Sequence, residues 1–193
     1  PGNLAWIYFP TGAQYPLVLT YSTVYLLGLP LLFIFSPVTA YNLVFLLTFF
    51  LSGMSAYALC YTLTRNRWAG ILGGVIYAFF PGRMAHALAG HIELVSTYLF
   101  PLYLLLLVET VRQPRWGRSI LCGLVLGASM LVQPLYIPFL LVPVTLVWLL
   151  VERWMLHTPL DRRRWLHLAG IFGLGVLVAA PLFWPALSQQ VLG

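Results

Sequence analysis

Long apolar runs separated by short polar segments dominate the chain. A helix needs about 20 apolar residues to cross a hydrocarbon core of about 30 Å, and it pairs its own backbone amides. The apolar runs predict six membrane spans, at about residues 38–64, 68–80, 92–111, 117–132, 135–151 and 165–184. The second run has only thirteen residues, a length more typical of a partial or tilted element than of a full crossing.

The segment at residues 15–36 has a different pattern, because it mixes apolar residues with tyrosines, threonines and the internal Pro30. Tyrosine favours the membrane–water interface, and an internal proline removes a backbone hydrogen bond from a helix. We expect a helix that lies at, or dips into, the outer interface; a full span is the alternative. The predicted fold class is all-α, a polytopic transmembrane helical bundle of about six spans plus one interfacial helix.

Composition agrees with a membrane protein. The chain is 61% hydrophobic and 7% charged, against roughly 25% charged residues in soluble domains. No Asp, Glu, Lys or Arg occurs before Arg65. The chain begins with Pro-Gly-Asn and ends with Val-Leu-Gly, so we interpret residues 1–193 as a single transmembrane domain that is a fragment from inside a longer protein.

The positive charges predict the orientation. The net charge of +6 comes from arginine alone, and nine of the ten arginines occupy three loops. These are Arg65 and Arg67, then Arg112, Arg115 and Arg118, and finally Arg153, Arg162, Arg163 and Arg164. If 68–80 crosses, all three loops share one face, which the positive-inside rule makes cytoplasmic. We therefore expect a bacterial cytoplasmic membrane protein with no nucleic-acid partner.

Glycines recur at a spacing of four residues, which lets helix backbones approach closely. The pairs are Gly70 with Gly74, Gly123 with Gly127, and Ala169 with Gly173. They predict close helix packing.

The stretch "FFPGRMAHALAGHIELVS", residues 79–96, places Arg83, His86, His91 and Glu93 within eleven residues, on the face opposite the arginine loops. One interpretation is a substrate-facing site, because a guanidinium can hold a phosphate bidentately and a histidine can donate a hydrogen bond or exchange a proton. The other is plain solvation at the outer surface, or a structural salt bridge from Arg83 to Glu93.

Chemistry other than binding has less support in the sequence. His86, His91 and Glu93 can all ligate metal, but the spacing H-x4-H-x-E matches no hydrolase motif, so we predict no metal site. No cofactor is evident, with a divalent metal as the alternative. Nucleotide-binding, serine-nucleophile and calcium-loop motifs are absent from the sequence.

The order of segments in "YPLVLTYSTVYLLGLPLLFIFSPVTAYNLVFLLTFFLSGMSAYALCYTLTRNRWAGILGGVIYAFFPGRMAHALAGH" resembles the middle of the GT-C superfamily of polytopic glycosyltransferases, the protein mannosyltransferase and aminoarabinose transferase type. An interfacial helix leads to a long span, then to the turn Thr64-Arg65-Asn66-Arg67, and then to a short span rich in small residues that ends at Phe80-Pro81. The resemblance covers roughly residues 15–150.

This resemblance implies transfer of a sugar from a polyprenyl-phosphate carrier to an acceptor at the outer face. The partners would be membrane lipid and the polyprenyl-phosphate-linked sugar donor. Arg83 and His91 would contact the phosphate of the carrier, and Glu93 or His86 would line the acceptor side. The catalytic aspartate of the family precedes the interfacial helix, whereas no acidic residue precedes Glu93, so no catalytic residue is assigned within this chain.

Two other classes of protein compete with this interpretation. In a transporter or lipid flippase, Arg83 and the histidines would line a permeation path near the middle of the membrane. In a non-enzymatic membrane scaffold, residues 79–96 would be only a solvated loop.

Overall fold

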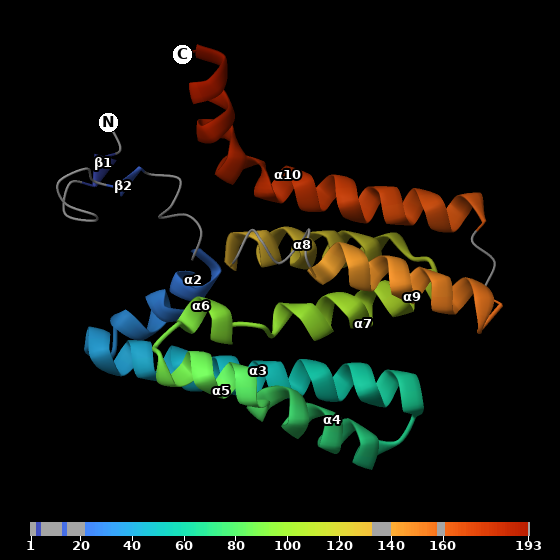
Figure 1. The fold of residues 1–193 in the computed structure, drawn as a ribbon, viewed down its shortest axis with the longest axis horizontal. Helices are drawn as coiled ribbons and strands as arrows, with labels where there is room; N and C mark the ends of the chain where they lie inside the picture. The colour runs from blue at the N-terminus through green and yellow to red at the C-terminus, as the bar shows by residue number, and fades with distance from the viewer. Residues whose placement is uncertain (1–2, 5–12, 15–21, 133–139, 158–160, 193) are drawn as a thin grey trace.

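The computed structural model describes residues 3–4, 13–14, 22–132, 140–157 and 161–192. Two short strands, β1 (Asn3–Leu4) and β2 (Ala13–Gln14), pair antiparallel. All other regular elements in these ranges are helices: α2 (Ser22–Leu32), α3 (Pro37–Thr64), α4 (Arg67–Phe79), α5 (Pro81–Leu88), α6 (Ile92–Val95), α7 (Leu99–Arg112), α8 (Trp116–Val132), α9 (Val142–Trp154) and α10 (Arg162–Leu192). Apart from the β1–β2 pair, the described residues confirm the prediction of an all-α fold (Figure 1).

Helices occupy the predicted apolar segments, but several bounds differ. The segment at 92–111 contains two helices, α6 and α7, with a break at residues 96–98. Helix α10 runs from Arg162 to Leu192, beyond the predicted 165–184. Helix α9 begins at Val142, whereas the prediction began at residue 135; residues 133–139 lie outside the described part of the chain. The described part of the predicted interfacial segment is α2, whose eleven residues span about 16 Å. Residues 15–21 of that segment lie outside the described residues.

Among the described residues, four helical stretches are long and apolar enough to cross a membrane: Pro37–Thr64, Arg67–Leu88, Ile92–Arg112 and Arg162–Ala180. The second joins α4 and α5 end to end. Phe80 between them has extended backbone angles, because the ring of Pro81 clashes with a helical conformation of the residue before it. Helix α5 therefore lengthens the thirteen-residue segment that was too short by itself.

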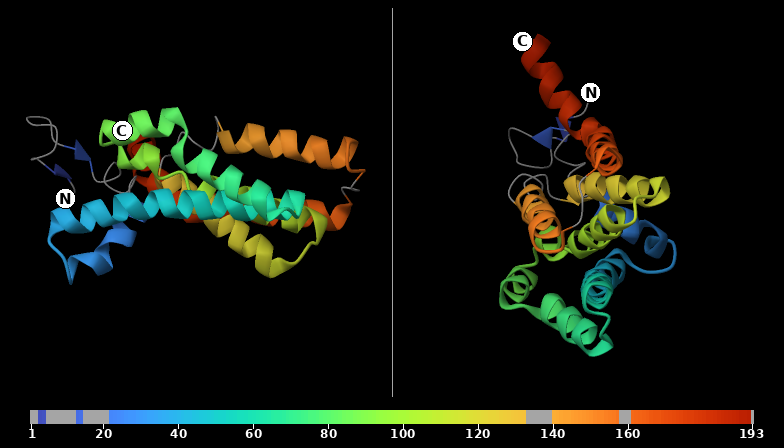
Figure 2. Two further views of the ribbon diagram at one scale, coloured as in Figure 1. Left: turned by 90° about the horizontal axis from the view of Figure 1, so that it is seen from below. Right: turned by 90° about the vertical axis from the view of Figure 1, so that its right-hand side faces the viewer.

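Helices α6 and α7 lie in the middle of the bundle. In the stretch that they form, Ile92–Arg112, 72% of the residues of the most apolar window are buried, whereas the share is 17 to 28% in the other three stretches. Helices α3 and α4 pack together on one side of α7, while α8 packs on the other side and carries α10 (Figure 2). The outer helices point apolar side chains away from the protein, for example Leu46 (65% exposed) and Leu177 (68% exposed), as lipid-facing helices do.

Glycines set the closest helix contacts. A Cβ atom added at Gly74 would lie 2.7 Å from the carbonyl oxygen of Gly53, and one at Gly127 would lie 2.5 Å from Cβ of Val178. The packing prediction is therefore confirmed for the pairs in α4 and α8. It is wrong at Gly173, where an added Cβ would meet nothing within 4 Å.

The arginine loops gather at one end of the bundle. In Figures 1 and 2 the α3–α4, α7–α8 and α9–α10 connections all lie at the same end, and α5 and α6 lie toward the other. Contacts join the second and third loops: Nε of Arg112 lies 2.9 Å from Oε1 of Glu152, and Nε of Arg164 donates to the carbonyl oxygen of Val111 at 2.7 Å. Sequence and structure thus agree on which loops share an end.

Candidate functional site

A tight turn after α5 presents the two histidines. Gly90 has a φ of +75°, a backbone conformation that glycine adopts without steric cost. The turn closes through hydrogen bonds from Gly90 N to the carbonyl of Ala87 (3.1 Å) and from His91 N to the carbonyl of His86 (3.0 Å). The hydroxyl of Tyr41 donates to the carbonyl of Gly90 at 3.2 Å and so attaches the turn to α3.

The turn brings His86 and His91 together at the surface. Their ring centroids are 5.8 Å apart, and both side chains are exposed. Glu93, in the short helix α6, is half-buried. Two neighbouring imidazoles place several ring nitrogens within reach of one ligand.

An apolar groove adjoins this turn. It has a volume of about 430 Å³ and lies between α2, the beginning of α3 and α6. Its lining includes Leu29, Val44, Tyr41 and Ile92. Ile92 directly follows His91, and Tyr41 also holds Gly90, so the groove lies beside the turn that His91 ends. Sequence reasoning missed this groove, because its walls come from three separate elements.

Arg83 lies elsewhere. Its side chain is completely buried and extends onto α3, where Nη2 donates to the carbonyl of Thr48 at 2.9 Å and the guanidinium lies 4.5 Å from the ring centroid of Phe49. Its Nε and Nη1 have no hydrogen-bond partner. The expectation that Arg83 shares the surface with the histidines is wrong, and the alternative of a salt bridge from Arg83 to Glu93 is absent from the described residues. The long side chain reaches α3, where a charge-assisted hydrogen bond and a cation–π contact offset part of the lost hydration.

Other polar groups are buried in this part of the bundle. The hydroxyl of Tyr77 donates to the carbonyl of Thr97 at 3.0 Å, and Oγ1 of Thr97 and Oγ of Ser52 are buried without a hydrogen-bond partner. These residues were not predicted. The sequence does contain a signal for Thr48 and Ser52, because they belong to a row of small residues and valine spaced four apart in the helix. This row forms the buried face of α3: Ala40, Val44, Thr48, Ser52 and Ala56.

Metal binding has no complete ligand set in the part of the chain that the structure describes. No group of three His, Cys, Asp or Glu side chains there could hold an ion. His86 and His91 supply two nitrogen ligands, and a structural zinc site needs four.

Comparison with known proteins gives one match. The model of a family described as a domain of unknown function, DUF6311, matches residues 19–190. The chain therefore belongs to this family. No curated protein and no solved structure matches the chain.

Proposed function

We propose that the chain is the membrane-embedded part of a glycosyltransferase that moves a sugar from a polyprenyl-phosphate carrier to an acceptor at the outer membrane face. The observation that supports this proposal best is the exposed pair of His86 and His91 next to an apolar groove. A polyprenyl phosphate has one long apolar chain and one charged head. The groove suits the chain, and the imidazole nitrogens suit the phosphate oxygens.

The position of this site in the bundle is also in keeping with the proposal. Helix α5 and the turn after it, which carry the histidines, lie toward the end of the bundle opposite the arginine loops. The positive-inside rule assigns the arginine loops to the cytoplasm. In this arrangement α2 lies at the outer interface, and about six spans cross a bacterial cytoplasmic membrane. The carrier would then arrive sideways from the outer leaflet.

The residues of the site take different parts in this proposal. His86 and His91 contact the phosphate, while Glu93, two residues beyond His91, faces the acceptor side. Arg83 is a positioning residue, because its buried contacts with Thr48 attach α5 to α3 and so fix the turn that carries the histidines. The general base belongs to a part of the protein outside this chain.

Photo-crosslinking of a long-chain polyprenyl phosphate tests the proposal. In membranes that contain the protein, the double variant His86→Ala/His91→Ala should crosslink at least about tenfold less than the unchanged chain, since the loss of even one charge-assisted contact costs about 1.5–3 kcal/mol. His157→Ala is the matched control, because His157 is also exposed but lies beyond α9, at the arginine end. Its crosslinking should not change.

Two results would contradict the proposal. One is equal crosslinking in the double variant and in His157→Ala. The other is equal crosslinking of a polyprenol that lacks the phosphate, which would mean that the histidines do not recognise the head of the carrier. Sugar transfer in the same membranes should fall in parallel with crosslinking; carrier movement across the bilayer without sugar transfer would assign the site to a flippase.

A further inference from the structure

A second hollow lies at the other end of the molecule, at the turn between α3 and α4. It has a volume of about 680 Å³, and its walls are mostly polar. It is lined by Tyr57, Tyr61, Thr64, Arg65, Asn66, Arg67 and Trp68. The rings of Tyr57 and Tyr61 stack in parallel with centroids 6.1 Å apart, which gives the hollow a flat aromatic wall.

The turn itself is well defined. Helix α3 ends at Thr64. The next residue, Arg65, has a φ of +55° that reverses the chain, and its N–H donates to the carbonyl of Tyr61 at 2.7 Å. Oδ1 of Asn66 then accepts hydrogen bonds from the backbone N–H groups of Trp68 (2.9 Å) and Ala69 (3.4 Å) and caps α4. The cap fixes the backbone from which both arginine side chains extend.

Arg65 and Arg67 have no acidic partner among the described residues. Each of the other two arginine loops contains acidic partners: Glu152 pairs with Arg112, Glu109 with Arg118, and Asp161 with Arg164, whereas Arg115 and Arg153 in those loops also have no acidic partner among the described residues. Both Arg65 and Arg67 are exposed. Two unpaired guanidinium groups beside one hollow attract an anion, and they can bind phosphate oxygens bidentately.

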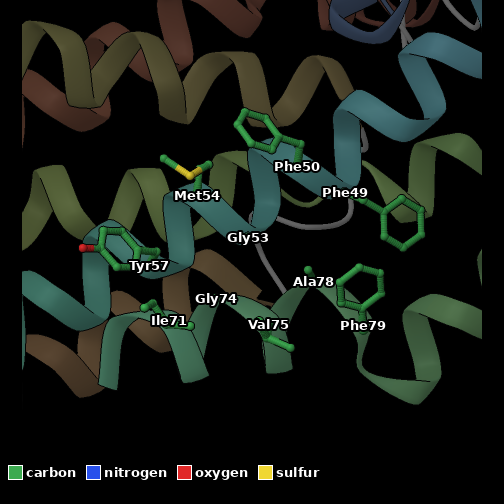
Figure 3. A pocket seen from close by; sticks show the side chains of 10 residues that line it. All are labelled: Phe49, Phe50, Gly53, Met54, Tyr57, Ile71, Gly74, Val75, Ala78 and Phe79. Carbon is green, nitrogen blue, oxygen red and sulfur yellow. The ribbon is translucent and has the colours of Figure 1, made fainter. Parts of the chain in front are cut away.

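An apolar groove next to this hollow lies along the same two helices (Figure 3). Its volume is about 420 Å³, and Tyr57 lines both spaces. Phe49 and Phe79 close its far end, while Gly53 and Gly74 form its floor, where α3 and α4 approach most closely. The lining is apolar along its whole length.

The length of the two spaces matches one leaflet of a bilayer. From Arg65 to Phe49, α3 rises about 24 Å at 1.5 Å per residue. One leaflet with its headgroups is about 20 Å thick. Trp68 is 68% exposed beside the hollow, and tryptophan and tyrosine favour the headgroup level. The cationic hollow and the apolar groove together therefore have about the length of one lipid molecule.

We infer that the α3–α4 hairpin binds an anionic diacyl phospholipid, with the phosphate between Arg65 and Arg67 and one acyl chain in the groove. A free phosphate would use only the polar hollow, whereas a phospholipid fills both spaces. The site lies at the opposite end of the bundle from the histidine pair, so it does not depend on sugar transfer. It holds lipid of the leaflet on the side of the arginine loops.

Lipid retention by the whole protein tests the role of the arginines. The protein, purified in detergent with equal amounts of phosphatidylglycerol and phosphatidylcholine, is measured by native mass spectrometry. Arg65→Gln/Arg67→Gln should lower the affinity for phosphatidylglycerol about thirtyfold, given about 1 kcal/mol per arginine at an anionic surface, and leave phosphatidylcholine unchanged. Arg115→Gln/Arg153→Gln is the matched control: it removes the same charge from two exposed arginines at the same end and should have little effect. An equal loss in the control pair would overturn the proposal in favour of general surface attraction.

A second variant tests the groove. Val75 lines it and is 53% exposed, so Val75→Trp should fill the space and reduce phosphatidylglycerol retention, whereas Leu146→Trp on the exposed face of α9 should not. Unchanged retention in Val75→Trp would refute the acyl-chain site. Millimolar inorganic phosphate should not displace the lipid; displacement would mean that the hollow takes a soluble anion. Unchanged elution in size-exclusion chromatography shows that each variant is folded.

Discussion

Gly74→Ala places one methyl group where α4 touches α3. An added Cβ atom would lie 2.7 Å from the carbonyl oxygen of Gly53 and 3.3 Å from Cβ of Tyr57. A backbone oxygen cannot rotate away as the end of a side chain can. To restore ordinary van der Waals contact, which begins at 3.4 Å, the two helices must separate by about 0.7 Å.

The energetic effect has two parts of opposite sign. A gap of about 0.7 Å removes a quarter to a half of the attraction between facing atoms, and overpacking of this kind costs about 1–3 kcal/mol. Alanine also has a higher helix propensity than glycine, by about 1 kcal/mol. Gly173→Ala gains the same propensity without the clash, because an added Cβ there meets nothing within 4 Å. The two variants should therefore differ by about 1–3 kcal/mol in the free energy of unfolding.

Labelling of Cys122 by a thiol-reactive fluorescent dye during heating measures this difference. Cys122 is completely buried, so it reacts only when the bundle opens. Both variants are made with Cys60→Ser, because Cys60 is partly accessible in the folded protein. Gly74→Ala should unfold about 2–10 °C below Gly173→Ala. Equal midpoints would show that α3 and α4 are not in the close contact described here.

Two further predictions concern the interior and the orientation of the bundle. Ser119→Ala should lower the free energy of unfolding by about 1–2 kcal/mol in the same thermal assay, because Oγ of Ser119 lies 2.7 Å from Nδ1 of the buried His167. Ser129→Ala removes only a hydrogen bond within α8, so it should destabilise the protein less. Equal destabilisation by the two variants would contradict a role for the hydrogen bond between the helices. A cysteine introduced at Ala85 should react with a membrane-impermeant reagent from outside intact cells, whereas one at Gly117 should react only after permeabilisation; the reverse pattern would invert the proposed topology.

Much of the helical framework could be predicted from the sequence. Helix α3 begins at Pro37 and ends at Thr64, close to the predicted 38–64. Ser36 caps its first turn, and the polar residues after Thr64 end the apolar run. The exception is instructive. The predicted span at 68–80 had only thirteen residues, and the structure extends it through α5 despite the interruption at Pro81. A prediction from hydrophobic periodicity or from the length of the apolar run ends at such a break, although a second helix continues beyond it.

The candidate site was predicted only in part. His86 and His91 do come together, because Gly90 permits the turn between them. The sequence did not reveal that Arg83 turns inward, since nothing within α5 distinguishes a solvated arginine from one that reaches Thr48, thirty-five residues earlier. The groove beside His91 was equally hidden, because it forms only where α2 and α3 meet Ile92.

The sequence by itself determined the class of fold and the grouping of the arginine loops, because hydrophobic length and charge placement are properties of consecutive residues. Tertiary structure decided which polar groups are buried and which are available to a ligand. That outcome depends on the neighbours that each side chain meets across the bundle: Arg83 meets the carbonyl of Thr48 and the ring of Phe49, whereas Arg65 and Arg67 meet no acid in the described residues. The same residue type therefore attaches one helix to another in the interior and forms a cationic surface at the end of the bundle.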